Sequence, residues 1–375
     1  MTRIHLIAGA RPNFMKVAPL YHALTATPWA EPVLVHTGQH YDAAMSDAFF
    51  ADLALPAPDH HLGVGSAGHA EQTARVMSGY DALCDRAPPD ATVVVGDVNS
   101  TLACALVAAK RRIPVAHLEA GLRAGDRGMP EEINRILTDH ACDLLWPPSD
   151  DAVANLRAEG IPEHRIALVG NIMIDSLVAL WPRIAAEGTA AALGLSRYVV
   201  ATFHRPANVD DPACLRTIVG ELRRVALEDP VVLPLHPRTA ARLEAAELLE
   251  SLRADCGVRV IEPLGYIAFL NLVSGAAAVV TDSGGIQEET SYLGIPCLTV
   301  RPNTERPVTV THGTNRLIAP AEIAERARAA AAPDCRRPAQ IPLWDGRTAG
   351  RVEASLRAFL ATAGDTAQTV HPANG

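Results

Sequence analysis

The stretch that decides the fold runs from residue 91 to residue 118 and reads ATVVVGDVNSTLACALVAAKRRIPVAHL. It begins with the apolar run Ala91–Val95, continues as a helical pattern over Thr101–Arg111 and ends with a second apolar run, Pro114–Leu118. Both runs are continuous rather than alternating, which is typical of strands buried on both faces of a parallel sheet. A strand, a helix and a second strand form a βαβ unit, so this stretch predicts a doubly wound α/β sheet.

The same rhythm extends outward along the chain in both directions. Further apolar runs predict strands at Ile4–Ala8, Pro32–His36, Leu144–Pro147 and Ile166–Val169 in the first half. Helical patterns alternate with them at Ala18–Ala26, Asp42–Leu53, Gly68–Cys84 and Pro130–Ala141. The pattern then restarts, with strands predicted at Tyr198–Thr202, Val231–Leu235, Val258–Ile261, Ala278–Thr281 and Cys297–Val300. We therefore predict two Rossmann-like doubly wound α/β domains that face each other across a cleft.

The domain boundary is predicted near Gly170. Residues 1–170 would form the first domain and residues 171–347 the second. A final helix at 348–363 would join the first domain, and residues 364–375 are expected to be a disordered tail. Ligands of open α/β sheets bind beyond the carboxyl ends of the strands, so unusual residues that follow strands are the candidates for function.

Composition excludes several classes of protein. The formal net charge of −9 argues against a nucleic-acid binder. The cysteines, 7 in number, contain no C-x-x-C pair, which argues against zinc ribbons and disulfide frameworks and fits a reducing compartment. The first apolar run is cut by Arg11, unlike a signal peptide, and no stretch is long enough to span a membrane. We expect a soluble cytoplasmic protein that needs no metal and no cofactor.

Two glycine-containing loops are candidates for binding phosphate. After the first strand, Arg11 and Lys16 bracket the start of a helix, where free N–H groups favour an anion. Ser283, Gly284 and Gly285 follow the strand Ala278–Thr281, with Ser283 as a natural N-cap and glycines that let a diphosphate approach the backbone. Each loop has a simpler alternative, namely solvated cations in the first and helix capping in the second.

Two further residues extend the second loop. Glu289 lies about one turn inside the helix, where it could accept hydrogen bonds from ribose hydroxyls. Arg306 lies in a loop stiffened by prolines after the strand Cys297–Val300 and is a candidate clamp for phosphate or ribose.

Three carboxylates of the first domain lie at the ends of strands or at the start of a helix. Asp97 follows one strand and could instead cap a helix. Glu119 ends an apolar strand, where a charge needs a partner or a task. Glu131 opens a helix and could instead pair with Arg135 at i+4. In the second half, His204 and His236 follow successive strands, and either could be functional or structural.

Together these segments resemble the non-hydrolysing UDP-N-acetylglucosamine 2-epimerases over nearly the whole chain, from Gly9 to Arg316. The most specific segments of the resemblance are TGQH at 37–40, GD at 96–97, HLEAGLR at 117–123, PEEINR at 130–135, DSGGIQEE at 282–289 and TERP at 304–307. Six ordered matches on two domains are far more specific than any one of them.

The resemblance implies a fold like that of GT-B glycosyltransferases and a reaction that inverts C2 of the sugar. UDP would be eliminated to give a 2-acetamidoglucal and then added back. The family's catalytic residues match Asp97, Glu119, Glu131 and His204. Its substrate contacts match Arg11, Lys16, Phe269, Ser283, Gly284, Gly285, Glu289 and Arg306. A second, activating nucleotide sugar would involve Gln39, Arg75 and His236, although Tyr41-Asp42 departs from the usual family segment.

Alternatives remain at this point. They are a GT-B glycosyltransferase, a hydrolysing epimerase, an epimerase of a modified sugar such as a 2,3-diacetamido uronic acid, and a non-catalytic nucleotide-sugar sensor. The family also implies a homodimer that supplies polysaccharide synthesis.

Overall fold

The computed structural model describes residues 1–38 and 50–368, apart from the side chains of Arg11, Pro333 and residues 363–368. The chain divides into two compact units. Unit 1 consists of Met1–Val178 with the segment from Pro342 onward, and unit 2 is Ala179–Ile341. The division lies beyond the predicted boundary at Gly170, within the helix α7 (Ile172–Ala186).

Unit 1 is built on a six-stranded parallel sheet with the order β3-β2-β1-β4-β5-β6. Its strands are β1 (Thr2–Ala8), β2 (Ala30–His36), β3 (His60–His61), β4 (Ala91–Val95), β5 (Val115–Leu118) and β6 (Leu144–Trp146). Every residue of β4 and β5 is buried, as their continuous apolar runs predict. The sequence did not predict β3, which is only two residues long.

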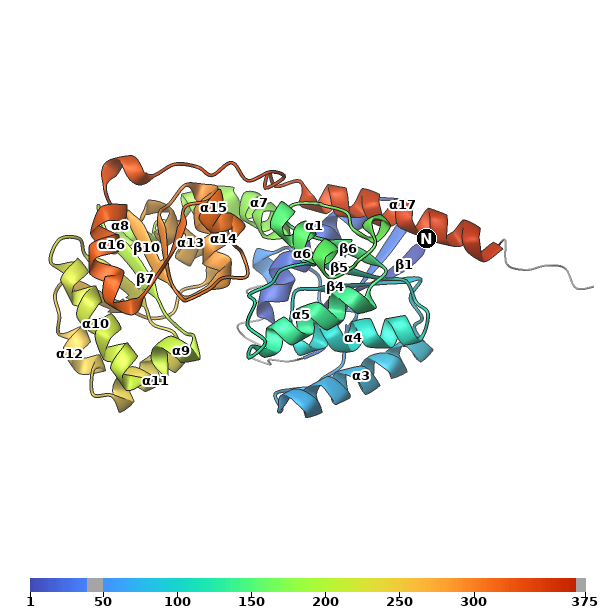
Figure 1. Ribbon diagram of the computed structural model, residues 1–375, viewed down its shortest axis with the longest axis horizontal. Coiled ribbons are helices and arrows are strands. Elements are labelled where there is room, and N and C mark those ends of the chain that lie inside the picture. Colours follow the sequence, from blue (N-terminus) through green and yellow to red (C-terminus); the bar gives the residue numbers. More distant parts are fainter. Residues whose placement is uncertain (39–49, 369–375) are drawn as a thin grey trace, which may run out of the picture. The chain divides into compact units, whose positions relative to one another are not determined.

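Helices cover both faces of this sheet. They are α1 (Arg11–Thr25), α3 (His69–Arg86), α4 (Asn99–Lys110), α5 (Pro130–Ala141), α6 (Asp150–Ala158) and α17 (Thr348–Gln368). In Figure 1, α3, α4 and α5 lie together on one face and α1 and α17 on the other. The predicted helix at 42–53 falls mostly on residues 39–49, outside the described residues.

The predicted strand at 166–169 is wrong. This segment lies beside β6 and donates hydrogen bonds from Ala167 N to Leu145 O and from Val169 N to Pro147 O, but it forms only the isolated bridge Leu145↔Ile166. Pro147 has no N–H, so it cannot return a hydrogen bond and the ladder stops there.

The C-terminal helix α17 belongs to unit 1. The Trp29 indole donates to Glu353 at 2.6 Å, and the Trp146 indole donates to Ser355 at 3.0 Å. The carboxylate of Asp175 accepts the first two backbone N–H groups of α17. The helix runs to Gln368, so residues 364–368 are helical where the sequence predicted a disordered tail. Residues 369–375 lie outside the described residues.

Unit 2 repeats the architecture with a six-stranded parallel sheet of order β12-β11-β10-β7-β8-β9. Its strands are β7 (Val199–Thr202), β8 (Val231–Pro234), β9 (Val258–Ile261), β10 (Ala278–Thr281), β11 (Cys297–Val300) and β12 (Asn315–Ile318). The sequence did not predict β12, in which only Asn315 and Ile318 are buried, because an exposed edge strand lacks a continuous apolar run.

The helices of unit 2 follow the βαβ rhythm. The longer ones and those near the site are α9 (Pro206–Val209), α10 (Pro212–Ala226), α11 (Pro237–Ala245), α12 (Leu249–Arg253), α13 (Tyr266–Gly275), α14 (Gly284–Leu293) and α16 (Ile323–Ala330). The segment that follows β8 forms two short helices, α11 and α12, with Glu247 between them at a positive φ of 57°.

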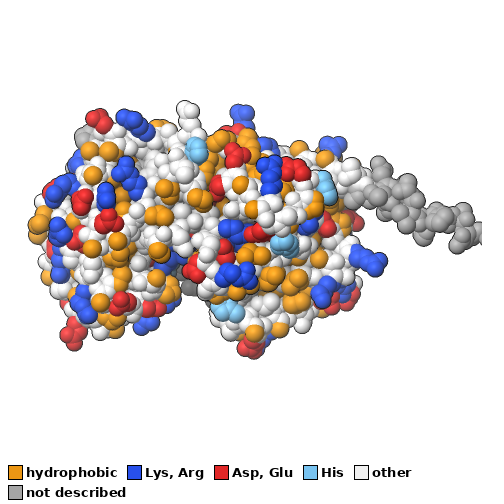
Figure 2. Space-filling view, in the orientation of Figure 1, with side chains coloured by type: hydrophobic (Ala, Val, Ile, Leu, Met, Phe, Trp, Pro, Cys, Tyr) orange, Lys and Arg blue, Asp and Glu red, His pale blue; other side chains and the backbone are white. Residues whose placement is uncertain are grey.

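Charged side chains of both signs are interspersed over the surface shown in Figure 2. Many of them form exposed ion pairs, such as Arg157 with Glu163 and Arg328 with Glu228. Each exposed pair contributes little to stability, because solvent screens the two charges. Stability therefore rests on buried apolar clusters. In one of them α3 and α4 pack against β2 and β4, and in another α10 and α16 pack against β7, β8 and β10.

Candidate active site

A buried ion pair lies at the carboxyl end of β4 in unit 1. Lys16, on α1, donates a hydrogen bond from Nζ to Oε2 of Glu119, and the two side chains are only 9% and 4% exposed. Gly96, directly after β4, lies beside both side chains. A Cβ at this glycine would lie 3.1 Å from Lys16 Nζ and 3.4 Å from Glu119 Oε2. The turn after β4 therefore leaves just enough room for the pair, which the sequence predicted as two separate site residues.

Glu119 occupies a strained backbone position. Its φ is +73°, in the left-handed region that costs a non-glycine residue about 1–2 kcal/mol. Both Glu119 and Ala120 donate their backbone N–H to Trp146 O, which holds the turn after β5 in place. A strained backbone persists only where the surrounding structure holds it, and such positions are concentrated at functional sites.

Two buried residues that the sequence reasoning did not single out hold this turn. His117 contacts Asp139 through Nδ1 at 2.7 Å and Gly96 O through Nε2 at 2.8 Å. Asp139 also accepts from Gly121 N and from Arg123. Burial opposes ionisation of Asp139, but the contacts with His117 and Arg123 hold its pKa below the ordinary value. In the sequence, the only indication of their role was their position: His117 opens the segment HLEAGLR, and Asp139 lies in α5.

Asp97 is held by an arginine that the sequence assigned to another partner. Arg135, which is 2% exposed, contacts Asp97 Oδ2 at 2.5 Å and Glu132 Oε2 at 2.6 Å. The alternative pairing of Glu131 with Arg135 is therefore wrong. A helix of 3.6 residues per turn places Glu132 on the buried face with Arg135 and leaves Glu131 exposed.

Glu132 and Glu131 are adjacent but have opposite environments. Glu132 is buried and accepts the backbone N–H groups of Ala124 and Gly125 at 3.0 and 2.8 Å. Burial opposes its ionisation, but these bonds and Arg135 hold its pKa below the ordinary value. For the exposed Glu131, no hydrogen bond or ion pair is present within the described part of the chain. Its carboxylate is thus open to a ligand.

In unit 2, His204 lies against a buried carboxylate. His204 Nδ1 is 3.0 Å from Asp282 Oδ1, and Asp282 also accepts the backbone N–H groups of His204 and Arg205. The sequence reasoning quoted Asp282 in its glycine-rich motif but gave it no role. The ring of His236 packs beside His204, with 5.6 Å between the ring centroids.

The start of α14 faces a cluster of charged side chains. Arg306 contacts Glu305 at 2.6 Å and Glu288 at 2.7 Å, and Arg301 contacts Glu305 at 2.8 Å. Burial opposes ionisation of Glu305, but Arg306 and Arg301 hold its pKa well below the ordinary value. A Cβ on Gly284 would lie 2.7 Å from Glu305 Oε1 and 2.8 Å from Arg306 Nη1. The backbone at Gly284 therefore lies beside both the Arg306 guanidinium and the carboxylate that pairs with it.

Ser283 differs from the prediction in one respect. It stands at the N-cap position of α14, but its side chain makes no capping hydrogen bond. Instead, Gln287 Nε2 donates to Ser283 O, while Gln287 Oε1 accepts from Thr304 and Asn315. This buried amide joins the start of α14 to the loop that carries Arg306.

Glu289 and Phe269 come from adjacent helices, α14 and α13. Glu289 is 4% exposed and accepts a hydrogen bond of 2.8 Å from Tyr266, which lies one turn before Phe269. Burial raises the pKa of Glu289 to about 8, against the effect of the Tyr266 hydrogen bond and together with the repulsion of Glu288. Phe269 is half-buried. Tyr266 was missed because its apolar helix gave no sign of a polar partner.

Several other predicted residues are not tested by this geometry. The side chain of Arg11 and the whole of Gln39 lie outside the described residues. Arg75 is exposed and pairs with Glu71 on α3. His236 is exposed and accepts the N–H of Arg238 at the start of α11. Both have local partners that account for their positions.

The comparisons with known proteins decide the family. The family model for UDP-N-acetylglucosamine 2-epimerase matches residues 22–357. The chain belongs to the UDP-N-acetylglucosamine 2-epimerase family. It is thereby a member of a family of isomerases.

Individual relatives agree with this assignment. The chain is 41% identical to the UDP-N-acetylglucosamine 2-epimerase of Methanocaldococcus jannaschii, over 84% of this chain and 88% of that protein. It is 40% identical to the UDP-2,3-diacetamido-2,3-dideoxy-D-glucuronate 2-epimerase of Pseudomonas aeruginosa, over 87% of this chain and 91% of that protein. Its fold is similar to the crystal structure of the Methanocaldococcus jannaschii UDP-GlcNAc 2-epimerase in complex with UDP-GlcNAc and UDP. That comparison gives a TM-score of 0.87 and 38% identity, over 95% of this chain and 100% of the other.

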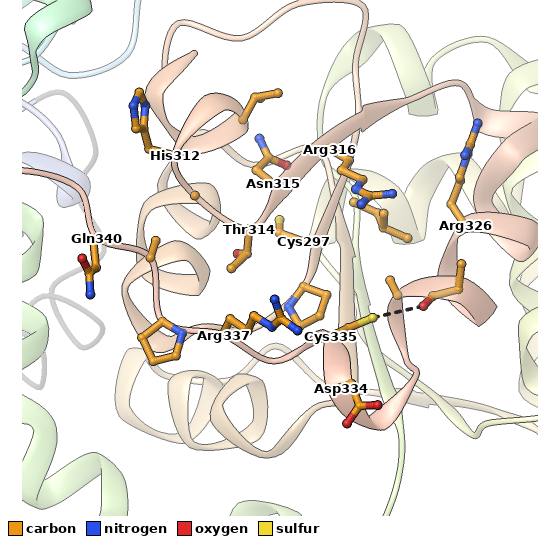
Figure 3. Close-up of a pocket in the computed structure, with 18 residues that line it drawn as sticks. Cys297, His312, Thr314, Asn315, Arg316, Arg326, Asp334, Cys335, Arg337 and Gln340 are labelled. Atoms are coloured by element: carbon orange, nitrogen blue, oxygen red, sulfur yellow. Dashed lines mark hydrogen bonds between the residues drawn. The ribbon is translucent and has the colours of Figure 1, made fainter.

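A cavity of about 850 Å³ in unit 2 is separate from the residues predicted for this epimerase family. Figure 3 shows its lining, which includes Arg316, Arg326 and Arg337. Its contributions from β11 and β12 are Cys297, Leu298, Asn315 and Arg316, the first residues of these strands. The predicted site residues instead follow the ends of strands, so this cavity is not where an open α/β sheet binds its ligand.

Residues 1–38 and 50–368 contain no group of three or more His, Cys, Asp or Glu side chains placed to hold a metal ion. No helix in these ranges combines the length and the apolar character needed to cross a membrane.

Proposed function

We propose that this chain interconverts UDP-N-acetylglucosamine and UDP-N-acetylmannosamine without hydrolysing them. The observation that carries the proposal is the buried Lys16–Glu119 pair at Gly96, with Asp97 held by Arg135 beside the same strand end. A nucleotide-binding protein without acid–base chemistry has no need of a strained, buried carboxylate at this position. The family match supports the reading of these carboxylates as catalytic.

The proposed reaction begins with elimination. The C2 hydrogen has no adjacent carbonyl, so a carboxylate alone is too weak a base to remove it. If cleavage of the C1–O bond runs ahead, positive charge develops at C1 and the C2 proton becomes acidic. The carboxylate base takes that proton, a C1–C2 double bond forms, and UDP leaves with the electron pair of the C1–O bond. The product is a 2-acetamidoglucal.

The second half of the reaction reverses these steps on the other face. An oxygen of the UDP diphosphate adds to C1, and a carboxylic acid returns a proton to C2 from the face opposite to the base. Asp97, Glu119 and Glu131 are the three groups proposed for these tasks, and the surplus carboxylate would stabilise the charge at C1. The exposed Glu131 has no internal partner among the described residues, which suits a group that must reach the sugar.

The remaining residues would bind the nucleotide and the leaving group. The start of α14 with Ser283, Gly284, Gly285 and Arg306 is proposed to hold the diphosphate, with Lys16, Arg11 and His204 opposing its charge. Glu289 and Phe269 are proposed to contact the ribose and the uracil. Oriented N–H groups and cations of this kind stabilise a departing diphosphate more than an intact substrate, which raises kcat rather than only lowering KM.

The test is incubation of the purified protein with UDP-N-acetylglucosamine in D₂O, followed by proton NMR. Deuterium at C2 together with intact UDP-N-acetylmannosamine is the expected result. Release of free N-acetylmannosamine and UDP would place the chain among the hydrolysing epimerases. The absence of any exchange would overturn the proposal for this sugar.

A second substrate has a specific observation in its favour. The Pseudomonas aeruginosa relative named for UDP-2,3-diacetamido-2,3-dideoxy-D-glucuronate is nearly as similar as the archaeal one. In this substrate an acetamido group replaces the hydroxyl at C3, and a carboxylate replaces the hydroxymethyl group at C6. Parallel kinetics on both nucleotide sugars distinguish the two functions, because the true substrate will show the higher kcat/KM.

We also propose that the protein acts in the cytoplasm as a homodimer that supplies polysaccharide synthesis. The cysteines support a reducing compartment, since all of them are free thiols in the structure. Light scattering on the purified protein tests the dimer. Activation by a second substrate molecule through Gln39, Arg75 and His236 would appear as sigmoidal kinetics, and hyperbolic kinetics would contradict it.

A further inference from the structure

His204 and Asp282 leave the sheet of unit 2 at the same edge. The parallel register places Thr202 at the end of β7 beside Thr281 at the end of β10. His204 follows β7 by two residues, and Asp282 follows β10 directly. The two side chains therefore meet because β7 and β10 are neighbours and their ends are aligned. Their spacing in the sequence does not reveal this contact.

The contacts make Asp282 a fixed partner. Its Oδ1 is 3.0 Å from His204 Nδ1, and its Oδ2 accepts Arg205 N at 3.0 Å and Asn208 Nδ2 at 3.1 Å. Asp282 is fully buried, whereas the His204 side chain is 39% exposed. The carboxylate therefore cannot turn to a ligand, and the imidazole is the member of the pair that reaches one.

The charge state of Asp282 decides which nitrogen of His204 carries hydrogen. Burial opposes ionisation of Asp282, but the contact with His204 and the donors from Arg205 and Asn208 hold its pKa below the ordinary value. An ionised carboxylate has no proton to donate, so the hydrogen in the contact belongs to Nδ1 of His204. Nε2 is then the nitrogen that gains or loses a proton.

We propose that Asp282 is a positioning residue that keeps Nδ1 of His204 protonated and confines proton exchange to Nε2. This inference rests on the proposed function, in which His204 contacts the departing diphosphate. In the protonated imidazole, Nε2–H donates a hydrogen bond to a diphosphate oxygen, and the Asp282 carboxylate stabilises the imidazolium charge. Asp282 acts only through His204 and does not touch the substrate.

A purely structural role is the competing explanation, because Asp282 also anchors the backbone before α9. Two substitutions separate the roles. Asp282→Asn keeps the shape but can donate its amide N–H to Nδ1, which forces hydrogen onto Nε2 in the neutral ring. Asn208→Ala removes the donor to Oδ2 and its bond to Val300 O, but leaves the imidazole contact in place.

The first readout is the tautomer itself. In protein labelled with ¹⁵N-histidine, long-range ¹H–¹⁵N correlation spectra distinguish the two neutral tautomers, and the His204→Asn variant assigns the signal. We expect the Nδ1–H form in the wild type and in Asn208→Ala, and the Nε2–H form in Asp282→Asn. A wild-type His204 in the Nε2–H form would overturn the proposal, and this measurement needs no variant of Asp282 that folds.

The second readout is kinetic. Asp282→Asn should lower kcat by about 10²-fold or more with KM changed by about 3-fold at most, the range for loss of a positioned acid–base group.

A double-mutant cycle completes the test. If Asp282 acts through His204, Asp282→Asn combined with His204→Asn should be no slower than His204→Asn alone. Additive losses, or an unchanged kcat in Asp282→Asn, would overturn the proposal. If the wild type does not exchange C2 hydrogen, the proposed function fails, whereas the tautomer measurement still decides whether Asp282 controls His204.

Discussion

Lys16 donates its hydrogen bond to Oε2 of Glu119, and the two residues come from α1 and from the turn after β5, with both side chains buried. A buried ion pair of this kind is costly to break, because removal of one partner leaves an uncompensated charge. Gly96, directly after β4, lies beside this pair, where a Cβ would approach both side chains.

Glu119→Gln should abolish most of the turnover. The amide can neither take nor return a proton, so we expect kcat to fall by about 10²- to 10⁴-fold. The exchange of the C2 hydrogen in D₂O measures this loss. Glu31→Gln is the control, since Glu31 pairs with Arg3 at the surface and should retain normal turnover. Normal exchange in Glu119→Gln would remove this residue from the chemistry.

The neighbours Glu131 and Glu132 should separate activity from stability. Glu131→Gln should lower kcat with little change in thermal midpoint, since the side chain is exposed. Glu132→Gln should destabilise the protein by about 3–5 kcal/mol, because it breaks a buried pair with Arg135. Calorimetry and steady-state kinetics on both variants check this. The hypothesis for Glu131 fails if its variant turns over as fast as the wild type.

Gly96→Ala should impair both stability and activity. Gly96 has a φ of +71°, and a Cβ would press on Lys16 and Glu119. Gly160→Ala is the matched control, because Gly160 has a φ of +81° with open space around it. Both variants should lose about 1–2 kcal/mol from the left-handed backbone. Only Gly96→Ala should also lose kcat, and equal activity in the two would contradict the role assigned to the cluster.

Arg306→Lys should weaken the binding of UDP. The guanidinium contacts Glu305 and Glu288 through different nitrogens, and a single ammonium cannot replace that geometry. We expect the dissociation constant of UDP, measured by titration calorimetry, to rise about 10-fold or more, which corresponds to about 1.4 kcal/mol. Arg326→Lys, in the separate cavity of unit 2, should bind UDP normally. Equal affinities for all three proteins would argue against a diphosphate at Arg306.

Glu289 should make stability fall as pH rises. Its pKa in the folded protein is raised to about 8 from an ordinary 4.5, so between these values the folded state binds more protons than the unfolded state. The contribution of Glu289 to the free energy of unfolding is therefore fully present below about pH 4.5. It is lost progressively as the pH rises to about 8. Glu289→Gln removes this titration, so its thermal midpoint should exceed that of the wild type by more at pH 8 than at pH 5. The exposed Glu250→Gln should follow the wild type at both values, and parallel curves for Glu289→Gln would contradict the assignment.

The sequence by itself determined the architecture, because a strand buried on both faces must be mainly apolar along its whole length. Runs such as Ala91–Val95 have this composition, as do the other strands in the interior of each sheet. Where the pattern is incomplete, prediction failed. The edge strand β12 has exposed residues and was missed, and the apolar run at 166–169 could not extend the sheet beyond the prolines that follow β6.

The sequence also indicated candidate residues for the chemistry, because strand ends and helix starts are local features. Only the tertiary structure decided which of these side chains contact each other. Arg135 pairs with Glu132 and Asp97 rather than with Glu131, Tyr266 donates to Glu289, and Asp282 holds His204. These contacts join residues that are 23 to 78 positions apart in most cases, on elements that parallel pairing brings to one edge. Spacing along the chain contains no information about such neighbours, since their distance is set by the order and register of the strands.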